Sequence, residues 1–357
     1  MSLFHEQFKR RWFLASIFAF IASCFERSKR PEENEENEET GEVMKNTDLP
    51  VALVYTTLLK VGDTIRPQQA DEFKNPYNSH LWIDEITFTA FPTSPVAGVA
   101  LTGKALKMRF KVDNRFVVED FAPFSLLAPR TDISEDVPTA VPASAAFALV
   151  DGLSITWKMP KPFWISKNEN LLMELRLDRN EVIAVNGDVT QQATVNVAIK
   201  GRATWDVPKE RCVPWVVSWR PEPFLTLPAP LVSPDEVLKN SRNQDVMVTR
   251  MLSDFGIEVF SQSCLNATQV PGDTWLKALI SHSGGYYIAK QPTPLQELFS
   301  GSRRNLDIRF PLRPLEFLTV QLEIDKPDLP LITSPTITRY YGGISLHGYS
   351  MEKVTAL

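Results

Sequence analysis

The stretch that decides the fold reads Asn75-Pro-Tyr-Asn-Ser-His-Leu-Trp-Ile-Asp-Glu-Ile86, and it aligns without gaps with Asn240-Ser-Arg-Asn-Gln-Asp-Val-Met-Val-Thr-Arg-Met251. Two further pairs of segments follow in the same order: Leu153–Trp157 with Leu306–Phe310, and Leu171–Leu177 with Leu318–Ile324. The spacing between the two copies shortens along the chain, as insertions in loops between fixed strands would produce. Two copies, each about a domain long, indicate tandem domains of one fold rather than a long repeat array.

The period of the apolar residues predicts what that fold is. From Asp48 onward apolar and polar residues alternate, as in the segment from Leu106 to Asp113. Alternation with a period of two is typical of strands that turn one face to a core. Only two short helices are predicted, at Val118–Leu127 and Pro294–Phe299. The predicted fold class is all-β: two tandem antiparallel jelly-roll sandwiches with short helices, preceded by an N-terminal helical arm.

Composition limits the class of protein. A chain of 357 residues has room for two domains, and its 27 prolines against 15 glycines suit a β protein with many loops. The formal net charge of −5 gives no reason to expect a specific nucleic-acid partner. The three cysteines, Cys24, Cys212 and Cys264, have no CxxC spacing, so neither a metal site nor a disulfide framework is predicted.

The same patterns divide the chain into five parts. We predict an apolar and basic helical arm at 1–30, an acidic flexible tether at 31–47, a first jelly roll at 48–206, a linker at 207–214 and a second jelly roll at 215–357.

The arm combines an apolar run with flanking positive charges. Trp12–Phe25 is apolar apart from two serines and a cysteine. As a helix it would be about 21 Å long, shorter than the roughly 30 Å hydrocarbon core of a bilayer. We therefore expect a helix that lies in the membrane interface, with its cations against anionic headgroups. The predicted membrane-contacting residues are Lys9, Arg10, Arg11, Trp12, Phe13, Ile17, Phe18, Phe20, Ile21, Arg27, Lys29 and Arg30.

Other interpretations of this segment stay open. It has the basic start and short apolar stretch of a signal peptide, and Ile21-Ala-Ser-Cys24 resembles a loose lipoprotein processing site. It could also pack its apolar face against neighbouring subunits. The segment Glu32–Glu42 that follows has seven glutamates and no apolar side chain, which predicts a tether that does not fold by itself.

No motif of catalysis is present. The sequence lacks GxSxG, GxxxxGK[ST], HExxH and a paired-acid motif, so we predict a protein that is not an enzyme and that has no cofactor and no metal. Trp215, Trp219 and Phe224 could form a sugar-stacking platform, but their place at the domain boundary favours packing between the two sandwiches.

Tandem sandwiches, a helix before the late strands of each and a membrane-seeking arm together resemble the double jelly-roll major capsid proteins of tailless icosahedral viruses. Tectivirus-like and corticovirus-like bacteriophages with an internal membrane are among these viruses. The resemblance covers about residues 48–357. It implies a homotrimer that forms a pseudo-hexagonal tile of the virion, with the arm towards the membrane, after assembly in the host cytoplasm. The implied partners are other copies of the chain, penton and minor capsid proteins, and membrane lipid.

Two other functions fit parts of the sequence. One is a lipid-anchored cell-surface protein, lipidated at Cys24, with two binding sandwiches. The other is a secreted carbohydrate-active enzyme, which the lack of a candidate acid pair disfavours.

Overall fold

The computed structural model describes residues 49–60, 62, 64–65, 79–92, 106–113, 115–129, 133–135, 153–177, 192–221, 231–261, 268–271, 276–299, 305–324 and 336–354. The predicted arm at 1–30 and tether at 31–47 lie outside these residues, together with every residue predicted to contact membrane. In the described ranges there is no helix with the length and apolarity needed to cross a bilayer.

The first sandwich consists of two sheets. One has the strand order β1 (Leu49–Lys60), β9 (Gln192–Thr204), β3 (His80–Pro92), β7 (Leu153–Ile165) and β6 (Ile133–Glu135). The other has the order β5 (Arg115–Pro123), β4 (Leu106–Val112), β8 (Leu171–Leu177) and β2 (Thr64–Ile65). With the main strands β1–β5 and β7–β9 lettered B to I in chain order, the sheets read B-I-D-G and F-E-H-C. This is the strand order of a jelly roll.

The second sandwich has the same order. Its first sheet runs β10 (Glu210–Trp219), β20 (Ile344–Lys353), β12 (Val246–Ser253) and β17 (Asn305–Leu312). Its second sheet runs β16 (Tyr287–Pro294), β15 (Leu276–His282), β18 (Leu318–Ile324) and β11 (Leu231–Val232). These are again B-I-D-G and F-E-H-C, so the fold is a double jelly roll. A small sheet of β14 (Thr268–Pro271), β13 (Gly256–Ser261) and β19 (Thr336–Tyr341) extends the D and I strands.

The predicted pairs of segments occupy equivalent strands. Ile83 lies in β3 and Val248 in β12, the D strands of their sandwiches, and both strands carry a bulge at the next residue. The E and H strands also share one register, because Leu106 lies opposite Leu177 as Leu276 lies opposite Ile324. The duplication of the D and H strands is therefore confirmed residue by residue. The predicted G pair lies in equivalent strands, β7 and β17, but out of register, because Ile86 lies opposite Trp157 whereas its equivalent Met251 lies opposite Leu306.

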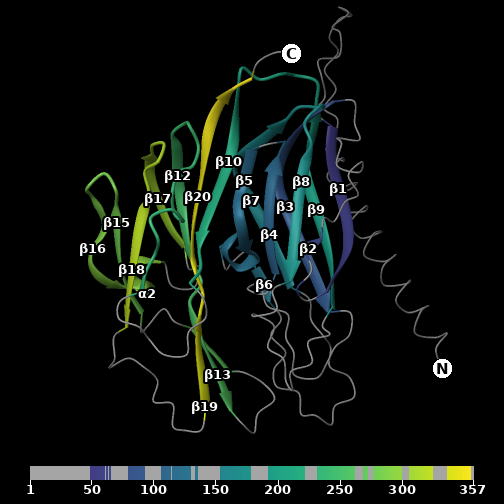
Figure 1. Ribbon diagram of the computed structural model, residues 1–357. Helices are drawn as coiled ribbons and strands as arrows, with labels where there is room; N and C mark the ends of the chain where they lie inside the picture. The colour runs from purple at the N-terminus through teal and green to yellow at the C-terminus, as the bar shows by residue number, and fades with distance from the viewer. Residues whose placement is uncertain are drawn as a thin grey trace, which may run out of the picture. The chain divides into compact units, whose positions relative to one another are not determined.

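The two sandwiches share one sheet. Strand β5 of the first runs parallel to β10 of the second, where Val118 and Val216 are paired. The result is an eight-stranded sheet with the order β17-β12-β20-β10-β5-β4-β8-β2 (Figure 1). Both sandwiches belong to one compact unit, Asn46–Leu357. Strand β10 begins at Glu210, inside the range 207–214 that the sequence predicts as a linker.

One of the two predicted helices is wrong. Most of Val118–Leu127 belongs to strand β5, and only η1 (Phe124–Leu126) forms a single 3-10 turn. The apolar side chains of this segment are buried from a strand. A short apolar run fits a buried strand as well as a helix, so the sequence pattern could not distinguish the two. The other prediction, Pro294–Phe299, contains α2 (Leu295–Leu298). Each turn follows the F strand of its sandwich, so the two remain equivalent.

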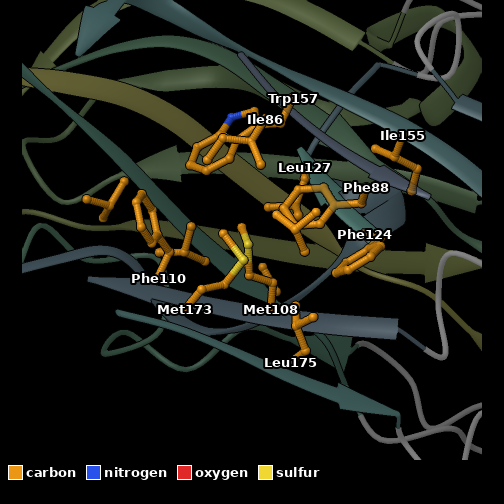
Figure 2. Packing of buried hydrophobic residues seen from close by; sticks show 14 of the residues in the cluster. Ile86, Phe88, Met108, Phe110, Phe124, Leu127, Ile155, Trp157, Met173 and Leu175 are labelled. Atoms are coloured by element: carbon orange, nitrogen blue, oxygen red, sulfur yellow. The ribbon is translucent and has the colours of Figure 1, made fainter. Parts of the chain in front are cut away.

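Each sandwich has its own core. In the first, side chains from β3 and β7 meet side chains from β4 and β8 between the sheets (Figure 2). Phe110 and Trp157 pack edge to face with ring centroids 6.4 Å apart, and Phe88 lies 4.5 Å from Phe124 of η1. Trp215, Val217 and Trp219 of β10 belong to the second core, while Val216 packs against the first. Strand β10 is thus buried on both faces.

Candidate functional site: the junction between the two sandwiches

The residues predicted to carry function, the membrane-contacting set of the arm, lie outside the described residues. Within the described ranges, no group of three or more His, Cys, Asp or Glu side chains could hold a metal ion. The arrangement of charge that stands out lies where the sandwiches meet. We call this contact the junction: β5 and the β7–β8 turn on one side, and β10, β20 and residues 240–242 on the other.

Four charged side chains of alternating sign tie the junction together. The guanidinium of Arg211 on β10 donates to both carboxylate oxygens of Glu169, at 2.8 and 2.6 Å, and lies 3.3 Å from Glu352. Arg115 at the start of β5 pairs with the same two carboxylates. The side chains of Arg211, Glu169 and Glu352 are 9%, 14% and 16% exposed, so their charges are compensated where water has little access.

The electrostatics of Glu169 reflect this setting. Burial by itself would raise the pKa of this carboxyl. Hydrogen bonds from Arg211 and from the Ser166 N–H, with the charges of Arg211 and Arg115, outweigh burial and hold the pKa below its usual value. Glu169 is therefore ionised at neutral pH, as the pairing with two arginines requires.

Arg242 forms a second link. Its guanidinium donates to the carbonyls of Phe116, Val213 and Pro214, at 2.8, 3.2 and 2.7 Å, and to the Ser350 hydroxyl at 2.7 Å. Burial lowers the pKa of Arg242 to about 10, against the opposing effect of nearby carboxylates, so it stays protonated at neutral pH. One side chain thus joins the backbone of β5 to that of β10.

Trp215 lies in the same contact. It is fully buried, and its indole N–H donates to Glu119 of β5 at 3.0 Å. Ser241 donates to the same carboxylate oxygen at 2.5 Å. The sequence predicts that Trp215 packs between the sandwiches, but its ring belongs to the second core and only its N–H reaches the first sandwich. Trp219 is buried in the second core, and Phe224 lies outside the described residues.

The other end of the contact is uncharged. The Ser345 hydroxyl donates to the Leu126 carbonyl at 2.8 Å, and Nε2 of His347 lies 2.8 Å from the same oxygen. His347 is almost fully buried on β20, and burial lowers its pKa to about 3. It is therefore neutral at physiological pH and can donate to this carbonyl as the Nε2–H tautomer.

The sequence analysis missed these residues. A signal was present, since Arg211 and Glu352 stand near the ends of strands whose middle parts contain no Asp, Glu, Lys or Arg. Their partners could not be identified, because Arg115 and Glu352 are 237 positions apart.

No family model and no curated protein matches the chain. Among solved structures it is similar to the major capsid protein P2 of bacteriophage PM2, with a TM-score of 0.39 and 7% identity, over 85% of this chain and 98% of that one. It is also similar to a chain in the cryo-EM structure of the Sputnik virophage, with a TM-score of 0.31 and 11% identity, over 92% and 93% of the two chains. The fold itself is established by the strand orders and registers above.

Proposed function

We propose that this chain is a structural protein, the major subunit of the icosahedral capsid of a virus with an internal membrane. The observation that carries the proposal is the fusion of two equivalent sandwiches into one block. A shared eight-stranded sheet and a buried, charge-balanced junction join them. A shell subunit needs such a body, stable and presenting a fixed surface to its neighbours, rather than a cleft for a substrate.

The tile that we propose is a homotrimer. Two equivalent sandwiches in each chain let three copies present six similar units, which is the requirement for a pseudo-hexagonal tile. Other copies, penton proteins and minor shell proteins would then be the partners in the virion, after assembly in the host cytoplasm.

The arm gives the proposed tile its contact with membrane. The basic and apolar residues between Lys9 and Arg30 suit the interface of an anionic bilayer. The acidic tether at 31–47 separates this segment from the sandwiches.

Static light scattering of the purified full chain tests the tile. We expect a particle with the mass of three 40.3 kDa chains over a wide range of concentration. A monomer at every concentration, with no larger species after chemical crosslinking, would rule out the trimer.

A further inference from the structure

Two of the sheet edges left open among the described residues, β1 and β16, are of the two kinds that meet at the junction. Within the chain, an F edge, β5, meets a B edge, β10. The remaining F edge is β16 of the second sandwich, which pairs only with β15 in the described ranges. The remaining B edge is β1 of the first, which pairs only with β9 there.

Strand β1 is an unusual edge. It is twelve residues long, carries no charge before Lys60, and has its single proline, Pro50, at its second residue. Its side chains Leu49, Val54 and Leu58 are 50%, 63% and 44% exposed. Natural proteins protect long edge strands with charges, prolines or bulges, because an unprotected edge pairs with another chain. A surface of this kind indicates a protein partner.

The internal duplication identifies the positions on β1 that correspond to the junction. Gly201 and Gly348 are equivalent, so Ala203 and Ser350, two residues later, are equivalent too. Leu49 lies opposite Ala203 as Val213 lies opposite Ser350. Three residues further along, Ala52 therefore takes the place of Val216, which pairs with β5.

The same reasoning applies to β16. Ala289 lies opposite Ile280 as Val118 lies opposite Phe110, at equivalent positions of the E strands. The contact of Val118 with Val216 thus has its counterpart in Ala289 and Ala52.

The ion pair has a counterpart as well. Counting from the shared glycine, Trp205 stands where Glu352 stands, and Tyr286 precedes β16 where Arg115 begins β5. The ion pair of Arg115 with Glu352 is therefore replaced by a tyrosine and a tryptophan, which are 52% and 51% exposed.

Exposure supports the correspondence. Val213 is 2% exposed at the junction, whereas its equivalent Leu49 is 50% exposed. Leu49 is thus a hydrophobic side chain that a second junction would cover. Aromatic residues such as Trp205 and Tyr286 are also the types enriched in the centres of protein interfaces.

We propose that β16 of one copy docks beside β1 of the next copy, and so repeats the internal junction between chains. Ala289 meets Ala52, and Tyr286 stacks against Trp205. The contact is heterologous, so repetition closes a ring when the rotation permits. This inference rests on the proposed trimer and adds to it the surfaces that meet.

Disulfide trapping tests the edge pairing in the full chain. The background carries Cys24→Ser, Cys212→Ala and Cys264→Ser, so that no native thiol competes with the introduced pair. In this background Ala52→Cys with Ala289→Cys should give crosslinked species up to three chains, because paired strands bring Cβ atoms within disulfide range.

Two matched controls complete the trapping. Moving the second cysteine to Val232 on β11, the opposite edge of the same sheet, should abolish crosslinking. Ala52→Cys alone should stay uncrosslinked. Dimers from that single variant would mean that β1 pairs with β1 of another copy, and would overturn the proposal.

The aromatic contact is tested separately. Tyr286→Ser with Trp205→Ser should raise the concentration at which the trimer dissociates by about tenfold or more. Val232→Ser, which alters a side chain of similar exposure away from both edges, should leave it unchanged. If the trimer forms but the two cysteines do not crosslink and the Tyr286 and Trp205 substitutions have no effect, the proposed interface is overturned while the trimeric tile is retained. A monomer would overturn both.

Discussion

Gly201 and Gly348 show how one backbone contact imposes a residue type twice. A Cβ atom at Gly201 would lie 1.8 Å from the carbonyl oxygen of Trp82, and one at Gly348 would lie 2.5 Å from that of Met247. Both glycines face the bulged part of the neighbouring D strand. Only a residue without Cβ permits so close an approach of two backbones.

Gly201→Ala should therefore destabilise the protein strongly. The clash is with backbone, which cannot rotate away, and we expect a loss of about 3 kcal/mol in the free energy of unfolding, at the upper end of the range for overpacking. Gly285→Ala is the comparison, because a Cβ atom there would meet no neighbour. Only the positive φ of 88° is unfavourable for alanine, which should lower the free energy of unfolding by about 1 kcal/mol. Urea unfolding measures both. Equal losses for the two variants would contradict the steric argument.

His347 makes stability depend on pH. Its pKa of about 3 in the folded protein lies below the usual 6.5 of the unfolded chain. Between these values the unfolded chain binds a proton that the folded protein does not, so acid favours unfolding. The contribution of His347 is complete above about pH 6.5 and falls by up to about 1.4 kcal/mol per pH unit below it.

His347→Gln should remove this dependence, since an amide can still donate to the Leu126 carbonyl but does not titrate. The comparison is the slope of unfolding free energy against pH for the two proteins, between about pH 7 and pH 4.5. Because other groups titrate alike in both, the difference isolates His347. Identical slopes would show that His347 protonates at its usual pKa in the folded state.

Among the secondary-structure elements, strands β5 and β10 form the contact between the two sandwiches. Each is the edge of its own sheet, and their parallel pairing at Val118 and Val216 removes two edges at once. The charges of Arg115, Glu169 and Arg211 then fix which part of β5 faces which part of β10. We infer that this pairing sets the register of the two sandwiches.

Removing one charge of the junction should cost more than breaking a surface pair. Arg211→Met leaves Glu169 and Glu352 with one arginine between them, and we expect a loss of about 3 kcal/mol in unfolding free energy. Lys200→Met breaks the ion pair with Glu85 on the outer face of the first sandwich, where the side chains are 38% and 25% exposed, and should cost at most about 1 kcal/mol. Adding Glu169→Gln to Arg211→Met should recover part of the loss. An Arg211→Met variant as stable as Lys200→Met would show that the charges do not hold the sandwiches together.

At the scale of the whole molecule, we predict that the arm can be altered without changing the stability of the sandwiches. Replacement of Lys9, Arg10, Arg11, Arg27, Lys29 and Arg30 by glutamine should weaken binding to anionic vesicles, by roughly 1 kcal/mol per cation that lies near the surface. Binding should also become less sensitive to salt. The melting temperature of the sandwiches should not change, because the acidic tether separates them from the arm. A full chain that ignores anionic vesicles at low salt would contradict the membrane role.

The sequence by itself determined the strands, because apolar and polar residues alternate along it. It also determined that the D, G and H strands occur twice. These are local properties, because strand period and the similarity of two segments are written in consecutive residues. The helix predicted at Val118–Leu127 failed where a strand continues to Pro123, since a short apolar run fits either structure.

Only the tertiary structure decided which strands are neighbours, which edges stay open and which charges meet. Trp215 and Glu119 lie 96 positions apart, and Arg115 and Glu352 lie 237 apart. Contacts at such separations depend on how the chain passes between two sheets, which no local pattern encodes. Long-range packing therefore decided the junction and the open edges of β1 and β16, while the sequence by itself determined the pair of sandwiches that meet there.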